Sequence, residues 1–97
     1  MRRLPPLHPG EVLREEFMQP KSLTPYALAA RIGVPRTRIE RIAREEMGIS
    51  VDTALRLGAY FRTTPEFWLN LQNRFEIETA RRDRGVVREL QQIGRAA

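Results

Sequence analysis

A run of arginines at helical spacing is the feature of this sequence best suited to recognising a ligand. The side chains that could do so are Arg36, Thr37, Arg38, Arg41 and Arg44. An arginine fork matches the O6 and N7 atoms of guanine, and a threonine can offer its hydroxyl to a base or touch a thymine methyl. These residue types on one side of a helix indicate a surface that reads DNA bases.

A helical wheel divides this segment into an apolar and a polar face. At about 100° per residue, Ile39 and Ile42 fall on one side. The opposite and flanking positions are taken by Thr37, Arg41, Arg44, Arg36 and Arg38. A plainer alternative is a solvated surface helix whose arginines pair with Glu40 or Glu45 at helical spacing.

The residues before this segment indicate how it is held. Thr24 can cap a helix that starts at Pro25 and runs to about Ile32, because proline at the first position needs no helical donor. Gly33 can take the left-handed conformation that ends a helix, and Pro35 starts the next one. Two helices and a tight turn predict a helix-turn-helix, with Thr24 beside the DNA, and favour base reading over the solvated helix.

Proline, serine and threonine mark further helices, and no stretch alternates in the manner of a strand. One helix is expected from Pro9 to Pro20, one after Ser50 and one after Thr64. Beyond them a conditional helix is expected, interrupted near Gly85. The predicted fold is all-α: a five-helix helix-turn-helix bundle with an additional C-terminal helical extension. Its parts are an extended arm (1–8), a DNA-binding domain (9–76) and the extension (77–97).

Composition limits the other possibilities. Ninety-seven residues, 41% of them hydrophobic, suffice for one modest core. The net charge is +5, and sixteen of the seventeen basic residues are arginine, which favours nucleic acid as a partner. There is no cysteine and His8 is the sole histidine, so we expect no metal site, no cofactor and no enzymatic activity. No apolar run approaches the roughly 20 residues of a membrane span, and a cytoplasmic protein is expected.

Two sets of residues resemble known families. The run from Leu23-Thr24 through Leu28-Ala29 to Gly33-Val34 resembles the Xre/phage-repressor helix-turn-helix family. Over residues 7 to 80 the chain resembles the HigA antitoxins more closely. The matching segments are His8–Leu13, Gly48–Ser50, Ala54–Leu57 and Thr64–Gln72.

The resemblance implies a lambda-repressor-like fold and a homodimer that represses its own operon by binding a palindromic operator in double-stranded DNA. It also implies neutralisation of a HigB toxin, a RelE-like ribonuclease that cleaves messenger RNA. In the phage-repressor pattern the first, second and sixth positions of the recognition helix touch base edges. These positions are Arg36, Thr37 and Arg41, two of which the wheel independently places outermost.

The chain departs from the family at three places. Pro25 stands where relatives often have a glutamine that contacts the DNA backbone, so that contact should be missing. Glu45 and Glu46 occupy a loop where many relatives have an Asn-Gly turn and basic residues. Arg62 replaces a common glycine, which makes the end of the fourth helix less certain.

A further set of residues is suggested for protein contacts. Phe67 and Leu71 are expected in the core, whereas Trp68, Phe75 and Leu90 are candidates for a dimer or partner interface. Acidic candidates for a basic toxin are Glu11, Glu15, Glu16, Glu76 and Glu78. For the arginines of the tail, a solvated helix face is favoured.

Two other functions stay open at this point. The chain could be an Xre-type transcriptional regulator without a toxin partner. It could also be a toxin-binding module that no longer reads DNA, which Pro25 and the Glu45-Glu46 loop would suit.

Overall fold

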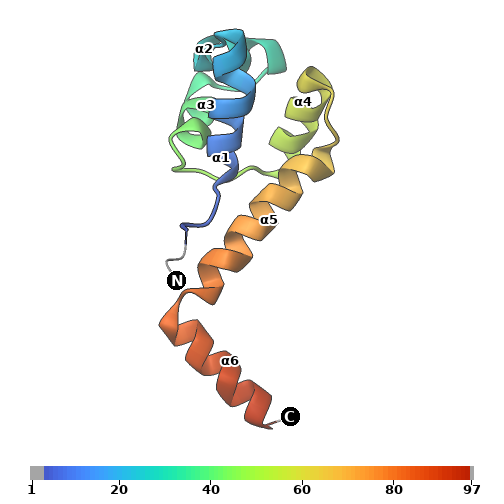
Figure 1. Cartoon of the computed structure of the whole chain (residues 1–97). Coiled ribbons are helices and arrows are strands. Elements are labelled where there is room, and N and C mark those ends of the chain that lie inside the picture. Colours follow the sequence, from blue (N-terminus) through green and yellow to red (C-terminus); the bar gives the residue numbers. More distant parts are fainter. Residues whose placement is uncertain (1–3, 97) are drawn as a thin grey trace.

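Helices joined by short turns make up the regular structure of residues 4–96, the part of the chain that the computed structural model describes (Figure 1). The α-helices are α1 (Pro9–Val12), α2 (Pro25–Ile32), α3 (Arg36–Ala43), α4 (Val51–Phe61), α5 (Pro65–Arg81) and α6 (Arg84–Ala96). A π-helical turn, η1 (Leu13–Met18), and a 3₁₀ turn, η2 (Gln19–Lys21), continue α1. The predicted all-α class is confirmed, and none of the described helices is long and apolar enough to cross a membrane.

Three predicted caps are present at the starts of α2, α4 and α5. The hydroxyl oxygens of Thr24, Ser50 and Thr64 accept the backbone N–H three residues later at 3.1, 3.2 and 3.1 Å. Pro25 and Pro65 follow two of these caps, where a missing N–H costs nothing. Each cap contributes about 1 kcal/mol to its helix.

The first helical segment, made up of α1, η1 and η2 (Pro9–Lys21), differs in detail from the expected Pro9–Pro20 helix. It widens into a π-helical turn and ends one residue later, at Lys21, through a 3₁₀ turn that contains Pro20. Because proline has no amide hydrogen to donate, the regular ladder cannot continue through it. Ser22 ends this turn in the left-handed conformation, with φ of 49°.

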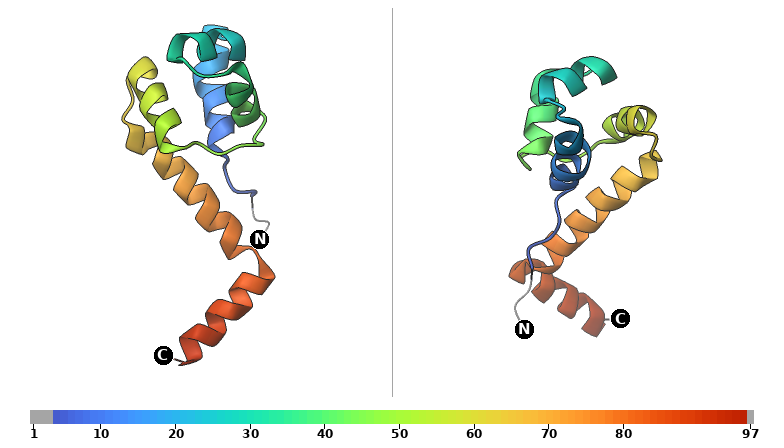
Figure 2. Two further views of the ribbon diagram at one scale, coloured as in Figure 1. Left: turned by 180° about the vertical axis from the view of Figure 1, so that it is seen from behind. Right: turned by 45° about the horizontal axis from the view of Figure 1, so that its top comes forward.

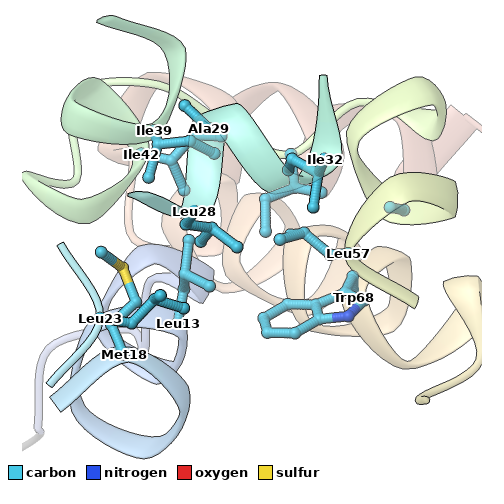
Figure 3. Packing of buried hydrophobic residues seen from close by; sticks show 12 residues of the cluster. Leu13, Met18, Leu23, Leu28, Ala29, Ile32, Ile39, Ile42, Leu57 and Trp68 are labelled. Atoms are coloured by element: carbon cyan, nitrogen blue, oxygen red, sulfur yellow. The ribbon is translucent and has the colours of Figure 1, made fainter. Parts of the chain in front are cut away.

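One hydrophobic core lies where the first segment, α2, α3, α4 and the start of α5 meet (Figure 3). Trp68 is fully buried at this junction. Its ring stands 4.9 Å from that of Phe17, and its Nε1–H donates to Thr63 Oγ1 at 2.8 Å. The start of α5 is thereby fixed against the first segment.

The roles expected for the aromatic side of α5 are wrong in two respects. Trp68 was expected at an interface, yet its side chain is wholly inside the core and can meet no partner. Phe67 was expected in the core but keeps 38% of its surface exposed, and Leu71 is half-buried at the edge of the core. The helical spacing of the residues cannot tell which side of α5 docks on the bundle.

α5 and α6 leave the bundle and make the molecule elongated, 51 Å along its longest axis (Figures 1 and 2). α5 is continuous to Arg81, so the boundary expected after residue 76 lies inside this helix. The break comes at Arg82–Asp83, slightly before the expected Gly85, because Asp83 Oδ1 accepts the N–H of Val86 at 3.1 Å and starts α6.

Residues 4–8 are not helical, as expected for an arm, and they lie along α5 (Figure 2). The guanidinium of Arg82 donates to the carbonyl of Leu4. The ring of His8 meets that of Phe75 edge to face, with the ring centres 4.6 Å apart. Residues 1–3 of the expected arm, and residue 97 of the expected extension, lie outside the described part.

Candidate nucleic-acid interface

α3 presents two different faces, as the wheel predicts. Ile39 and Ile42 are fully buried in the core. Arg36, Thr37 and Arg41 are exposed on the other side. The helix therefore offers solvent two guanidinium forks and a hydroxyl while its apolar face holds it against the bundle.

The turn between α2 and α3 has the predicted geometry. Gly33 has φ of 73° and ψ of 38°, in the left-handed region. The N–H groups of both Gly33 and Val34 donate to the carbonyl of Ala29, which closes the end of α2. Ala29 is 2% exposed, so its small side chain lets the two helices approach closely.

Arg36 is paired along its own helix. Its Nε atom lies 3.2 Å from Glu40 Oε1, four residues away, and its side chain remains 60% exposed. An exposed pair of this kind contributes about 0.3–0.5 kcal/mol, so a DNA phosphate or a guanine could replace it at small cost. The pairing expected for a solvated surface helix is therefore present at Arg36 in the free protein. This pairing does not prevent Arg36 from binding DNA.

Arg38, also expected on this surface, is turned toward α4. Its Nη1–H donates to Asp52 Oδ2 at 2.8 Å, and the side chain is only 33% exposed. Asp52 holds this guanidinium beside α4, whereas the side chain of Arg41 is exposed to solvent.

Arg56 connects the same carboxylate to the helix-turn-helix turn. Its Nε–H lies 3.1 Å from both oxygens of Asp52, and its Nη1–H donates to the carbonyls of Ile32 at 2.8 Å and Gly33 at 3.3 Å. Hydrogen bonds from Arg56 and Arg38 lower the pKa of Asp52. Since these carbonyls end α2, one side chain of α4 satisfies the turn that positions α3.

A second arginine holds the other end of α3. Arg14, from η1, donates through Nη1 to the carbonyl of Ala43 and through Nη2 to Glu45 Oε2 at 3.2 Å. Glu45 has φ of 64°. The unusual carboxylate of this loop therefore faces the first segment. Arg44, expected to bind DNA, is the exposed C-cap residue of α3.

The other residues expected to contact DNA or a partner differ in their exposure and in the groups they can offer. Thr24 is exposed, and while its oxygen accepts the cap bond, its O–H can still donate to a phosphate. Pro25 follows it with neither a side-chain nor a backbone donor. Of the interface candidates, Phe75 is half-buried against His8, and Leu90 is 54% exposed on α6.

Sequence reasoning missed the side chains from other segments that hold the α2–α3 turn and the end of α3 in place. Arg14 and Arg56 read as ordinary surface cations, because the carbonyls they serve lie 29 and about 24 residues away in the chain. Only the i, i+4 spacing of Asp52 and Arg56 could have pointed to one half of this arrangement.

A helix-turn-helix whose second helix is anchored at both ends and carries outward arginines and threonine defines a DNA-binding regulator. Comparison with known proteins agrees with this class. Residues 15–68 match the model of the helix-turn-helix family HTH_3, and the chain belongs to this family.

Similar proteins include a virulence-associated protein and several antitoxins. Virulence-associated protein I of Dichelobacter nodosus is 44% identical over 84% of this chain and 75% of its own length. The structure of Pseudomonas aeruginosa antitoxin HigA with the higBA promoter is similar, with a TM-score of 0.79 and 42% identity over 91% of this chain and 90% of that one. An addiction module antidote protein of the HigA family from Coxiella burnetii has a TM-score of 0.83 and 38% identity, covering 92% and 95% of the two chains. The predicted resemblance to HigA antitoxins is confirmed.

Proposed function

We propose that this protein is a HigA-type antitoxin that acts in the cytoplasm, represses its own operon as a homodimer and neutralises a HigB-like toxin by direct binding. Its role is binding, without catalysis. The observation that carries the DNA half of the proposal is the outward position of Arg36, Thr37 and Arg41 on a helix whose opposite face is fully buried.

The residues proposed to read bases are Arg36, Thr37 and Arg41. Arg44 and Thr24 are proposed to contact the phosphate backbone of the DNA. Guanidinium forks discriminate guanine by about 1–3 kcal/mol for each good bidentate pair. The similar HigA of Pseudomonas aeruginosa, whose structure was solved with its promoter, supports a promoter sequence as the target. A palindromic operator would require two copies of α3 related by a twofold axis, which is the reason for proposing a homodimer.

Titration of the palindrome upstream of the gene tests the DNA half. Wild-type protein should retard this duplex, and an Arg36→Ala, Arg41→Ala double variant should bind it at least tenfold more weakly. An Arg74→Ala, Arg81→Ala variant removes the same charge from the second half of α5, away from α3, and is the matched control. Equal affinity of the two double variants would contradict the proposed readout.

Co-expression with the neighbouring gene tests the toxin half. A short basic RelE-like protein encoded beside this gene should arrest growth alone and be rescued by this chain, and the two should co-purify. Rescue without operator binding would identify a toxin-binding module instead. Operator binding without rescue would identify a transcriptional regulator that has no toxin partner.

A further inference from the structure

The carboxylate of Asp52 lies between two arginines that belong to different parts of the helix-turn-helix. Arg38 reaches it from α3 at 2.8 Å, and Arg56 reaches it from α4 at 3.1 Å. The three side chains are 33%, 54% and 43% exposed in the order Arg38, Asp52, Arg56. The cluster therefore lies at the surface, beside the outward face of α3.

Asp52 is fixed on two sides. Both of its oxygens face the Nε–H of Arg56, whose Nη1–H is in turn committed to the carbonyls that end α2. Asp52 also stands in the first turn of α4, where the helix dipole favours a negative charge. A carboxylate held in this way can keep Arg38 in one position.

Release of Arg38 from Asp52 would add a positive charge to the surface beside α3. Arg38 lies in the first turn of α3, next to Thr37, so a released guanidinium would reach the phosphates that flank the groove. Each arginine that neutralises a phosphate strengthens binding to every DNA sequence alike. Specificity is the difference between operator and random DNA, so such a contact would add affinity without selectivity.

We propose that Asp52 is a specificity-determining residue. It holds Arg38 in an ion pair within the protein and so withholds one guanidinium per subunit from sequence-independent contacts with DNA. This inference rests on the proposed DNA-binding function and concerns how that function is made selective.

Salt dependence of binding to a random-sequence duplex provides the test, because it needs no knowledge of the operator. Asp52→Asn should make the plot of log Kobs against log salt concentration steeper by about 0.9 for each released arginine. Between 50 and 200 mM salt this adds roughly a 3.5-fold loss of affinity per subunit. At the low salt limit the variant should bind the random duplex more tightly than wild type does.

Two controls isolate the ion pair. Glu66→Gln changes the net charge equally at an exposed carboxylate in the first turn of α5, and it should leave the slope as in wild type. Adding Arg38→Ala to Asp52→Asn should reverse the steepening, since the released cation is then absent. Thermal unfolding of each variant confirms that folded protein is being compared.

Asp52→Glu keeps the carboxylate and should keep the wild-type slope. A slope in Asp52→Asn no steeper than in Glu66→Gln, steepening that survives Arg38→Ala, or equal steepening in Asp52→Glu would each overturn the inference. A wild-type protein with no salt-dependent duplex binding would instead overturn the proposed function itself.

Discussion

Gly10 of α1 lies directly against the backbone carbonyl of Ile42 in α3, so closely that a Cβ atom at residue 10 would overlap the carbonyl oxygen. This contact sets how near the first segment approaches the proposed DNA-reading helix. It is a backbone-to-backbone packing, so no flexible side chain can move aside to relieve an added methyl group.

Gly10→Ala should therefore destabilise the protein and disturb the position of α3. Overpacking of a close contact typically costs about 1–3 kcal/mol. Urea unfolding should show that loss, and the affinity for DNA should fall with it. Gly94→Ala in α6 is the control, because nothing lies within 4 Å of a Cβ there and alanine favours a helix by about 0.5–1 kcal/mol. Equal stability of the two variants would show that the contact at Gly10 can relax.

His8 should make stability depend on pH. Its Nδ1 atom accepts the N–H of Gly10 at 2.8 Å, and the side chain is 5% exposed. Burial lowers the pKa of His8 from its ordinary value of 6.5, Glu45 acts to raise it and Arg14 acts to lower it. Below pH 6.5 the unfolded chain takes up a proton that the folded chain does not, so stability is full above pH 6.5 and falls as the pH is lowered toward the folded pKa.

The expected slope is at most about 1.4 kcal/mol per pH unit. Unfolding free energies measured from pH 7.5 to 5 would reveal it before most carboxylates titrate. His8 is the N-cap residue of α1. His8→Asn can still cap this helix but does not titrate, and should flatten the dependence over this range. A wild-type curve as flat as that of the variant would contradict the role of the imidazole.

Trp68 should behave as a core residue. Trp68→Ala removes a fully buried side chain and its hydrogen bond to Thr63, and a loss of about 3–5 kcal/mol is expected. Phe67→Ala, at a position 38% exposed, should cost clearly less. Thermal unfolding of both variants decides the order. A larger loss for Phe67→Ala than for Trp68→Ala would contradict this placement and favour Phe67 as the core residue.

Helix caps and left-handed turns could be predicted from the sequence because each depends on a few adjacent residues. They include the caps at Thr24, Ser50 and Thr64 and the turn at Gly33. The buried side of α3 was predictable because its apolar residues repeat at helical spacing. The side of α5 that carries Trp68 was not, since it depends on how whole helices dock.

Long-range polar contacts could not be predicted from the sequence either. The position of Arg38 on its own helix predicts a contact with DNA, and only the structure brings it to Asp52 of α4. For the same reason Arg14 gave no local sign that it caps the carbonyl of Ala43. The outward surface of α3 was thus predictable, while the supports that position it were not.

Arg62 occupies a conformation better suited to glycine, at φ of 60° and ψ of 39°. A non-glycine residue in this region costs about 1–2 kcal/mol. Arg62→Gly should relieve that cost and raise the unfolding midpoint, whereas Gly33→Ala, at φ of 73°, should lower it. Opposite shifts in thermal unfolding are expected for the two variants, and a destabilising Arg62→Gly would show that the arginine makes a compensating contact.

Arg14 should support DNA binding without touching DNA. Its guanidinium donates hydrogen bonds to the carbonyl of Ala43, in the last turn of α3, and to the Glu45 carboxylate at the same time. The single ammonium of a lysine cannot reproduce both bonds in the same geometry.

Arg14→Lys keeps the charge and should lower the free energy of unfolding by about 1 kcal/mol. It should also weaken operator binding several-fold while leaving the salt slope unchanged, because no phosphate contact is lost. Arg74→Lys is the matched control, since Arg74 is 81% exposed and pairs with Glu78 of its own helix. A changed salt slope in Arg14→Lys would mean that Arg14 contacts DNA directly, and wild-type behaviour would mean that α3 does not need this support.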